Sequence, residues 1–476
     1  MNMSTWAIRH PVPPIAAFLV LVLVGLFAFR GLPVTQFPNI DVPIITVAVG
    51  QPGAAPSELI TQVTKPIEDS ISSITGVKHI ASVATDSSSQ TTVEFELSTD
   101  SDRALNDVKD AVTRARSSLP DSITEPLVQR LDITGQAIMT YAVSDPTRSI
   151  EDLSYFVDEV LNRELQGIAG LGKIERLGGA DREIKVELDP QRLLAFGISA
   201  ASISRQLSAT NINQGAGRGD LAGQEFSIRT LGGAATIAQL AATPLSMPDG
   251  RTIRLSDVGD IIDGPSEARD FATLDAQPVV AFGVFRATGA SDLSVAERVR
   301  DRLVEVRAAY PGVEIMLIDD ATEYTAGNYH SAMETLYEGA ALAIIVVFLF
   351  LKNWRATLIT AVALPLSIIP TFFVMQMLGF SLNTVSLLGI TLVTGILVDD
   401  AIVEIENIVR HIHMGKPAYE ATEEAAGEIG LTVIAISFTI VAVFAPVSFM
   451  SGIAGQYFKQ FGLTVAVAVL FSLLVA

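Results

Sequence analysis

Long apolar blocks and one long polar region divide this chain. Most blocks hold roughly 15–20 apolar residues, near the length that a helix needs to cross a bilayer. They cover residues 13–29, 339–351, 356–378, 385–403, 429–449 and 461–476, and the polar region lies between residues 30 and 332. The block at 339–351 is short for a span, so we expect its helix to begin further back, near Tyr324. The pattern predicts six membrane helices.

The first apolar block has two interpretations, a cleaved signal peptide or an uncleaved membrane anchor. Arg9 and His10 precede it, but residues 29–32 lack the small-residue pattern of a cleavage site, which favours the anchor. Basic residues then predict the orientation. If every block spans once, one side carries Arg9, Lys352, Arg355, Arg410 and Lys416, and only Lys459 lies in a short loop opposite. We expect the amino terminus inside and the polar region outside.

The polar region begins with alternating strand and helix patterns. Period-2 runs rich in Val, Ile and Thr predict strands at 44–49, 77–83 and 91–97, and longer amphipathic runs predict helices at 57–74 and 102–117. The order strand, helix, strand, strand, helix matches a split βαβ unit, the ferredoxin-like sandwich.

A second copy of this unit is predicted further along, interrupted by an insertion. Its first part comprises a strand at 137–143, a helix at 150–165, and strands at 174–177 and 183–188. Its second part comprises a strand at 279–285, a helix at 293–309 and a strand at 313–318. Residues 211–232, within the insertion, have the pattern of a long hairpin. Such a hairpin is either a docking arm for another subunit or a mobile surface loop.

The pattern thus predicts a polytopic α-helical membrane protein with a large outer α+β region made of ferredoxin-like βαββαβ units and an insertion. The predicted boundaries are a first transmembrane helix at 1–30, a first sandwich at 31–130, a second sandwich at 131–188 and 265–325, an insertion at 189–264, and transmembrane helices two to six at 326–476.

Composition narrows the function classes. Hydrophobic residues make up 49% of the 476 positions, too many for an ordinary soluble protein. The 32 basic residues are outnumbered by 52 acidic ones, which argues against nucleic acid as a partner because phosphate binding needs clustered Lys and Arg. The chain has no Cys, so disulfides and thiolate metal sites are excluded, and we expect no metal site.

Two adjacent aspartates, Asp399 and Asp400, interrupt the apolar block at 385–403. A carboxylate at bilayer depth costs roughly 2.5–3.5 kcal/mol on insertion scales, so such residues are rare and usually mark ion or proton paths. The alternative is a buried soluble helix whose two acids form structural ion pairs. The neighbouring apolar blocks favour the membrane interpretation.

An acidic stripe continues from the aspartates along the same helix. Asp400 shares a face with Glu404 at i+4, about 6 Å along the axis, and Asp399 shares one with Glu406 at i+7, about 10.5 Å along it. Glu404 and Glu406 are either part of a proton path or charges at the membrane interface.

The aspartate pair suits proton-driven transport. Two carboxylates this close in a poorly hydrated site cannot both ionise freely, so we expect the pair to take up and release a proton and thereby change helix packing. Small residues at Gly389, Thr394 and Gly395 would let neighbouring helices approach closely.

No predicted span carries a Lys or Arg well inside the bilayer, and residues 473–476 end in an apolar run. We therefore expect a fragment or one half of a two-part pump, with the counter-ion supplied from elsewhere.

Several motifs resemble the resistance-nodulation-division (RND) efflux pumps over the whole chain, which corresponds to their amino-terminal half. They are FLKNWRATLI at 350–359, GILVDDAIV at 395–403 followed by Glu406-Asn407 and Arg410-His411, LPV at 32–34 with FP at 37–38, and PGA at 52–54. The paired aspartates resemble the hydrophobe/amphiphile efflux branch more than the heavy-metal branch.

This resemblance implies a secondary active transporter rather than an enzyme, driven by the proton motive force with no cofactor. It implies a homotrimer in the bacterial inner membrane, working with a periplasmic adaptor (membrane fusion) protein and an outer-membrane channel. The two sandwiches would be periplasmic porter subdomains, and the insertion a docking domain whose hairpin reaches the next protomer. Asp399 and Asp400 match the proton relay of the family, which a lysine from the missing carboxy-terminal half completes.

The substrates implied are hydrophobic or amphiphilic small molecules, taken from the inner membrane or periplasm, as in multidrug resistance. One departure bears on this: where relatives often carry phenylalanines, the chain has GQA at 135–137 and LGG at 177–179. Two other functions stay open: a half-pump or assembly subunit that transports nothing alone, and an exporter of an endogenous lipid or amphiphile.

Overall fold

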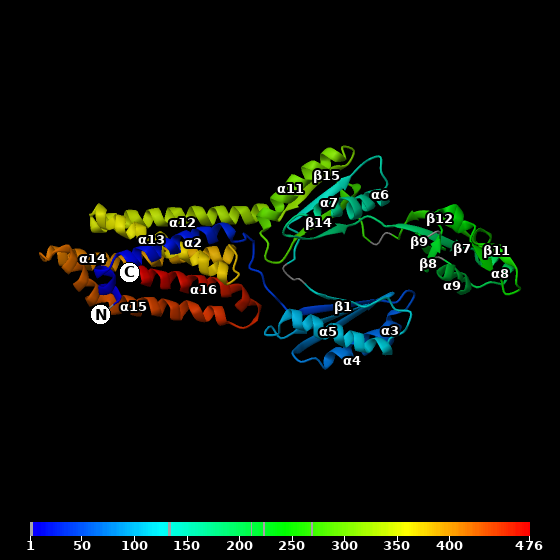
Figure 1. Cartoon of the computed structure of the whole chain (residues 1–476), viewed down its shortest axis with the longest axis horizontal. Helices are drawn as coiled ribbons and strands as arrows, with labels where there is room; N and C mark the ends of the chain where they lie inside the picture. Colours follow the sequence, from blue (N-terminus) through cyan, green and yellow to red (C-terminus); the bar gives the residue numbers. More distant parts are fainter. Residues whose placement is uncertain (1–2, 132–134, 211, 222–223, 268–269) are drawn as a thin grey trace.

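The computed structural model describes residues 3–131, 135–210, 212–221, 224–267 and 270–476. Within these residues, six helices are long and apolar enough to cross a membrane. They are α2 (Val12–Gly31), α12 (Ala321–Leu351), α13 (Trp354–Met377), α14 (Thr384–His413), α15 (Ala418–Phe444, continued by the 3-10 turn η5, Ala445–Phe449) and α16 (Gly452–Val475). They form one bundle (Figure 1), and the predicted spans are confirmed as helices.

Helix α12 begins well before its apolar block, as predicted. It follows directly on strand β15 (Glu314–Asp320), and its N-cap Asp320 accepts a hydrogen bond from the backbone N–H of Thr322. Inside the bundle, α14 and α16 bury aliphatic side chains such as Ile390, Val393 and Val465. A short helix, α1 (Met3–Arg9), packs against α15, where Arg9 pairs with Glu423 at 2.5 Å.

The first sandwich is a four-stranded antiparallel sheet in the order β2-β3-β1-β4. Its elements are β1 (Ile44–Gly50), α3 (Pro56–Leu59), the π-helix η1 (Ile60–Thr64), α4 (Lys65–Ser72), β2 (Val77–Thr85), β3 (Ser88–Phe95), α5 (Ser101–Ala115), the 3-10 helix η2 (Arg116–Ser118) and β4 (Leu127–Arg130). The inward-facing residues of β1 pack against the two helices, with Val47, Ile67 and Val108 fully buried or nearly so. Strand β4 was not predicted, because four residues are too few to show a period.

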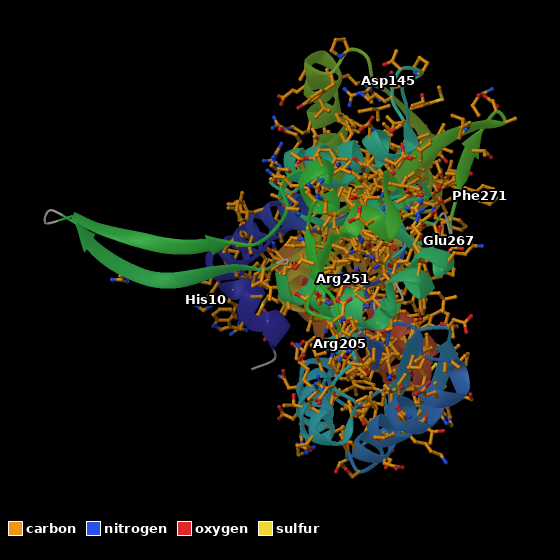
Figure 2. The ribbon with its side chains drawn as sticks, turned by 90° about the vertical axis from the view of Figure 1, so that its right-hand side faces the viewer. His10, Asp145, Arg205, Arg251, Glu267 and Phe271 are labelled. Carbon is orange, nitrogen blue, oxygen red and sulfur yellow. The ribbon has the colours of Figure 1, made fainter. Side chains whose placement is uncertain are left out.

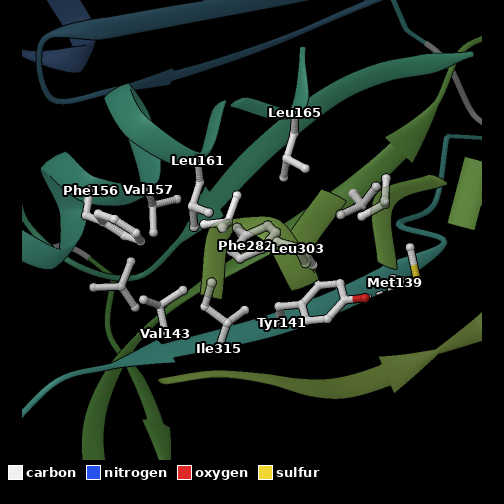
Figure 3. Close-up of a cluster of buried hydrophobic side chains, with 14 of the residues drawn as sticks. Met139, Tyr141, Val143, Phe156, Val157, Leu161, Leu165, Phe282, Leu303 and Ile315 are labelled. Carbon is white, nitrogen blue, oxygen red and sulfur yellow. Dashed lines mark hydrogen bonds between the residues drawn. The ribbon is translucent and has the colours of Figure 1, made fainter. Parts of the chain in front are cut away.

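The second sandwich repeats this arrangement. It contains β5 (Met139–Ser144), α6 (Ile150–Tyr155), the π-helix η3 (Phe156–Leu161), α7 (Asn162–Leu165), β6 (Leu171–Leu177), β13 (Ala272–Leu274), β14 (Gln277–Arg286), α11 (Asp292–Ala309) and β15 (Glu314–Asp320). The sheet order is β13-β14-β5-β15, with β6 also paired to β14. Figure 3 shows its core, where Tyr141 stacks on Phe282 with ring centroids 5.3 Å apart.

One strand of this prediction is wrong. We expected residues 183–188 in the second sandwich, but β7 (Arg182–Leu188) pairs with β12 (Gly259–Pro265) in a separate two-stranded sheet. Gly178 and Gly179, both with positive φ, turn the chain away directly after β6, and glycine adopts this conformation without a Cβ clash. The insertion therefore includes β7 and begins before the predicted boundary at 189.

The insertion has a small core of its own, formed by residues such as Ile203, Leu245 and Leu255. Its remaining elements are α8 (Pro190–Phe196), α9 (Ala200–Thr210), β8 (Asn213–Leu221), β9 (Gln224–Leu231), α10 (Ile237–Ala241), β10 (Pro244–Ser246), β11 (Thr252–Arg254) and the 3-10 turn η4 (Leu255–Asp257). Strands β8 and β9 pair as the predicted hairpin, and Figure 2 shows them extending as a long arm away from the rest of the molecule. Asn211 and residues 222–223 of that prediction lie outside the described residues.

Candidate functional site

Helix α14 carries the candidate site. It begins at a strong local signal: Asn383 caps the helix by accepting hydrogen bonds from the backbone N–H groups of Val385 and Ser386, both at 3.0 Å. The Ser386 hydroxyl accepts from the backbone N–H of Asn383 in return, which completes a capping box. This cap is almost completely buried, so the helix start is fixed within the bundle.

The two aspartates of α14 lie in different surroundings. Asp400 is buried, with 6% of its surface exposed, whereas Asp399 is exposed on the bundle surface. The carboxylate of Asp400 accepts a hydrogen bond of 2.8 Å from the Ser472 hydroxyl on α16. In the described part of the chain, no Lys or Arg pairs with Asp400. Its partner is therefore a neutral hydroxyl on another helix.

Helices α14 and α16 approach each other closely above this contact. A Cβ atom on Gly389 would lie 3.3 Å from the Phe461 ring and 3.4 Å from Val465, so only a very small residue fits there without adjustment. Thr394 is buried, and its hydroxyl donates a hydrogen bond to the carbonyl of Ile390. Gly395 faces open space among the described residues, so its predicted role in a close helix contact is wrong within this chain.

The two glutamates of the predicted stripe also differ. Glu404 is buried, one turn after Asp400, and lines an apolar cavity together with Phe18, Val433 and Leu470. Glu406 is exposed. The buried stripe therefore runs through Asp400 and Glu404, while Asp399 and Glu406 lie on the outward face of the helix.

Polar residues that were not predicted to belong to the site extend this buried face. Asn407 and His411 are also buried, and both contact Glu428 on α15, at 3.4 Å and 2.9 Å. Arg410 donates to the same carboxylate at 2.9 Å. These contacts fix the C-terminal end of α14 to α15.

A usable signal for these residues was present in the sequence. Asp400, Glu404, Asn407 and His411 follow each other at steps of four, three and four residues, which places them on one helix face. Ser472 had no such signal, because it lies 72 residues from Asp400 in the chain. Within the described residues, no group of three or more His, Asp or Glu side chains is placed to hold a metal ion.

Comparisons with a family model and with curated proteins point to the same family. A family model described as the AcrB/AcrD/AcrF family matches residues 3–476. The multidrug resistance protein MdtC of Pectobacterium atrosepticum is 31% identical over 471 residues, which cover 98% of this chain and 46% of that protein. MdtC proteins of Yersinia enterocolitica and Klebsiella pneumoniae are each 32% identical over 471 residues. The chain spans about half the length of the curated relatives it matches.

Proposed function

The chain belongs to the AcrB/AcrD/AcrF family of RND transporters, and from this premise we propose that it is part of a proton-driven pump that exports hydrophobic or amphiphilic compounds. The observation that carries the proposal is the placement of Asp400. Its carboxyl group is buried in the middle of a membrane helix, and its partner is the neutral hydroxyl of Ser472. Burying a carboxyl group at bilayer depth costs free energy, so such residues are rare and usually have a function in moving ions or protons.

In this proposal, Asp399 and Asp400 form the proton relay, and Glu404 and Glu406 lie on the path of the proton. Protonation of Asp400 removes a charge from the contact between α14 and α16, which changes the relative stability of two packings of these helices. Deprotonation reverses the change. The counter-ion is supplied by a part of the complete transporter outside this chain.

The surrounding assembly follows from the same premise. We place the amino terminus in the cytoplasm and the two sandwiches in the periplasm as porter subdomains. The insertion and its hairpin serve as a docking domain in a homotrimer, which works with a periplasmic adaptor protein and an outer-membrane channel.

The substrate class is supported less directly. The relatives at 31–32% identity are named multidrug resistance proteins, which favours apolar drugs and similar amphiphiles. Residues 135–137 and 177–179 offer no aromatic ring for stacking, so we propose that substrates are held there by shape and apolar contact.

The proposal is tested by Asp400→Asn in the complete transporter, with Asp86→Asn as the matched control. The amide has the size of the carboxyl group but cannot be protonated and deprotonated in turn. We therefore expect efflux to fall to the background of cells without the gene. Asp86 is exposed in the turn between β2 and β3, and the same change there should leave efflux unaltered.

Drug accumulation in cells and the amount of assembled trimer are the two measurements. Lost efflux with normal assembly supports the relay. Normal efflux with Asp400→Asn would instead favour a subunit that does not itself couple transport to protons.

A further inference from the structure

The short segment between α2 and β1 lies against the start of α14. The backbone N–H of Leu382 donates to the carbonyl of Pro33 at 2.9 Å, and the N–H of Thr35 donates back to the carbonyl of Leu382 at 3.1 Å. Val34 and Leu382 thereby form a parallel β-bridge. The segment before the first sandwich is thus bonded to the loop that starts the helix of the aspartates.

Side chains reinforce this contact. The Thr35 hydroxyl donates to the Ser381 hydroxyl at 3.0 Å, and both residues are almost completely buried. The Thr384 hydroxyl, on the first residue of α14, donates to the carbonyl of Gln36 at 2.9 Å. Breaking the contact would leave buried polar groups unpaired, which strongly disfavours an open state.

The opposite edge of the same segment is bonded to the start of α11. The backbone N–H of Asp292 donates to the carbonyl of Val34 at 2.9 Å, and the Asp292 carboxylate accepts from the N–H of Gln36 at 2.8 Å. The Ser291 hydroxyl also donates to Val34, at 3.2 Å. Residues 34–36 are therefore held on both edges, like the central strand of a sheet.

A buried ion pair fixes Asp292 on the second sandwich. Arg286, the last residue of β14, lies with its Nε 2.5 Å from the Asp292 carboxylate, and the two side chains are only 12% and 7% exposed. Arg286 also donates to the side-chain oxygen of Asn39 at 2.8 Å. Burial raises the pKa of Asp292, and the charge of Arg286 opposes that shift. Removing either partner would leave an uncompensated buried charge.

The membrane side of this connection includes α16. Asn383, the cap of α14, donates to the side-chain oxygen of Gln460 on α16 at 2.6 Å. Helices α14 and α16 are thus bonded at their outer end and again at Ser472 and Asp400. Hydrogen bonds through residues 34–36 therefore connect this helix pair to α11.

We infer that residues 34–36 are a coupling joint that transmits movement of α14 and α16 to α11 and the second sandwich, and that Asp292 is its positioning residue. The inference rests on the proposed function. The joint remains closed during the transport cycle, because each of its edges is hydrogen-bonded and the Thr35–Ser381 contact is buried. Protonation in the membrane therefore moves the second sandwich directly.

The first test measures coupling rather than activity alone. The complete transporter in proteoliposomes is compared with its Asp292→Ala and Asp292→Asn variants, and with Glu297→Gln, which removes an exposed carboxylate from the same helix. Substrate moved per proton taken up should fall by about tenfold with Asp292→Ala, a typical size for coupling between sites, while substrate KM stays unchanged. Asp292→Asn keeps an acceptor for the Gln36 N–H, so the substrate moved per proton should fall less in this variant. Glu297→Gln should keep the ratio of the unaltered protein.

The outcomes separate this inference from the proposed function. If Asp292→Ala lowers transport and proton uptake in equal measure, the residue is merely structural and the joint is refuted. If the unaltered protein transports without proton uptake, or Asp400→Asn keeps coupled transport, the proposed function fails and the joint fails with it.

A second test asks whether the joint stays closed. The hydroxyl oxygens of Thr35 and Ser381 are 3.0 Å apart, so a Thr35→Cys/Ser381→Cys variant suits a disulfide. We expect the oxidised variant to transport like its reduced form, because the two segments move together. An oxidised variant that stops transporting and recovers on reduction would show that the joint opens, which contradicts the inference.

Discussion

At the scale of single residues, the neighbouring aspartates of α14 differ because a helix points adjacent side chains about 100° apart. Asp400 faces α16 and is bonded to Ser472, whereas Asp399 faces away from this bundle. The same geometry separates Glu404, which is buried, from Glu406, which is exposed. Among the residues that the structure describes, it is the inner face of α14 that brings a carboxylate to a hydroxyl on another membrane helix.

Ser472 is the residue whose change should reveal this contact. A hydrogen bond to an ionised group contributes about 1.5–3 kcal/mol, so loss of the hydroxyl in Ser472→Ala should slow efflux by about tenfold or more. Ser472→Thr keeps a hydroxyl and should recover most of the rate. Efflux rates of both variants, at matched amounts of protein in the membrane, check this prediction. Equal rates for Ser472→Ala and the unaltered protein would show that the hydroxyl contributes nothing to the relay.

At the scale of elements, the position of α16 depends on glycines that allow backbone contact. A Cβ atom on Gly462 would lie 2.3 Å from the Ser448 hydroxyl and 2.6 Å from the Phe444 carbonyl, so α16 packs directly on the end of α15 and on η5. Gly339 on α12, by contrast, has no atom within 4 Å of such a Cβ among the described residues. A change to alanine therefore meets close neighbours at Gly462 and open space at Gly339.

We therefore expect Gly462→Ala to destabilise the bundle, because backbone atoms cannot move aside as a flexible side chain does. Gly339→Ala should be neutral or stabilise by about 0.5–1 kcal/mol, since alanine favours a helix more than glycine does. Thermal unfolding of the purified variants in detergent measures the difference. A Gly462→Ala protein as stable as the Gly339→Ala protein would mean that α16 has room to shift.

The sequence predicted most elements but not all of their partners. The first sandwich shows the expected strand and helix order, and the second shows it apart from the strand at 183–188. Each has a short π-helix, η1 or η3, in its first helix. β4 was too short to show a period, and β7 had the right pattern but pairs with β12 rather than within the second sandwich. A strand pattern states which faces are buried; it does not state which other strand supplies the hydrogen bonds.

At the scale of the whole molecule, the sandwiches and the insertion all lie on one side of the helical bundle (Figure 1). This arrangement agrees with the clustering of basic residues in the loops at the other side. It allows the proposed orientation to be tested by labelling, because this sequence has no Cys and each introduced thiol reports alone within it.

The prediction uses two exposed positions, Ser117 after α5 and Met414 after α14. In intact cells with a permeable outer membrane, a membrane-impermeant maleimide should label Ser117→Cys. It should label Met414→Cys only after the inner membrane is opened. The reverse pattern would place the sandwiches in the cytoplasm and contradict the proposed pump.

The sequence by itself determined the six spans, the outer strand and helix order, and the aspartate pair as the candidate site, because apolar periodicity and an acid inside an apolar block are local properties of the chain. Only the tertiary structure decided that Asp400 rather than Asp399 is buried against α16, that Ser472 is its partner, and that residues 34–36 join α14 to α11. These contacts join residues far apart in sequence. Which distant groups meet depends on how the helices and sheets pack, and no local pattern records that.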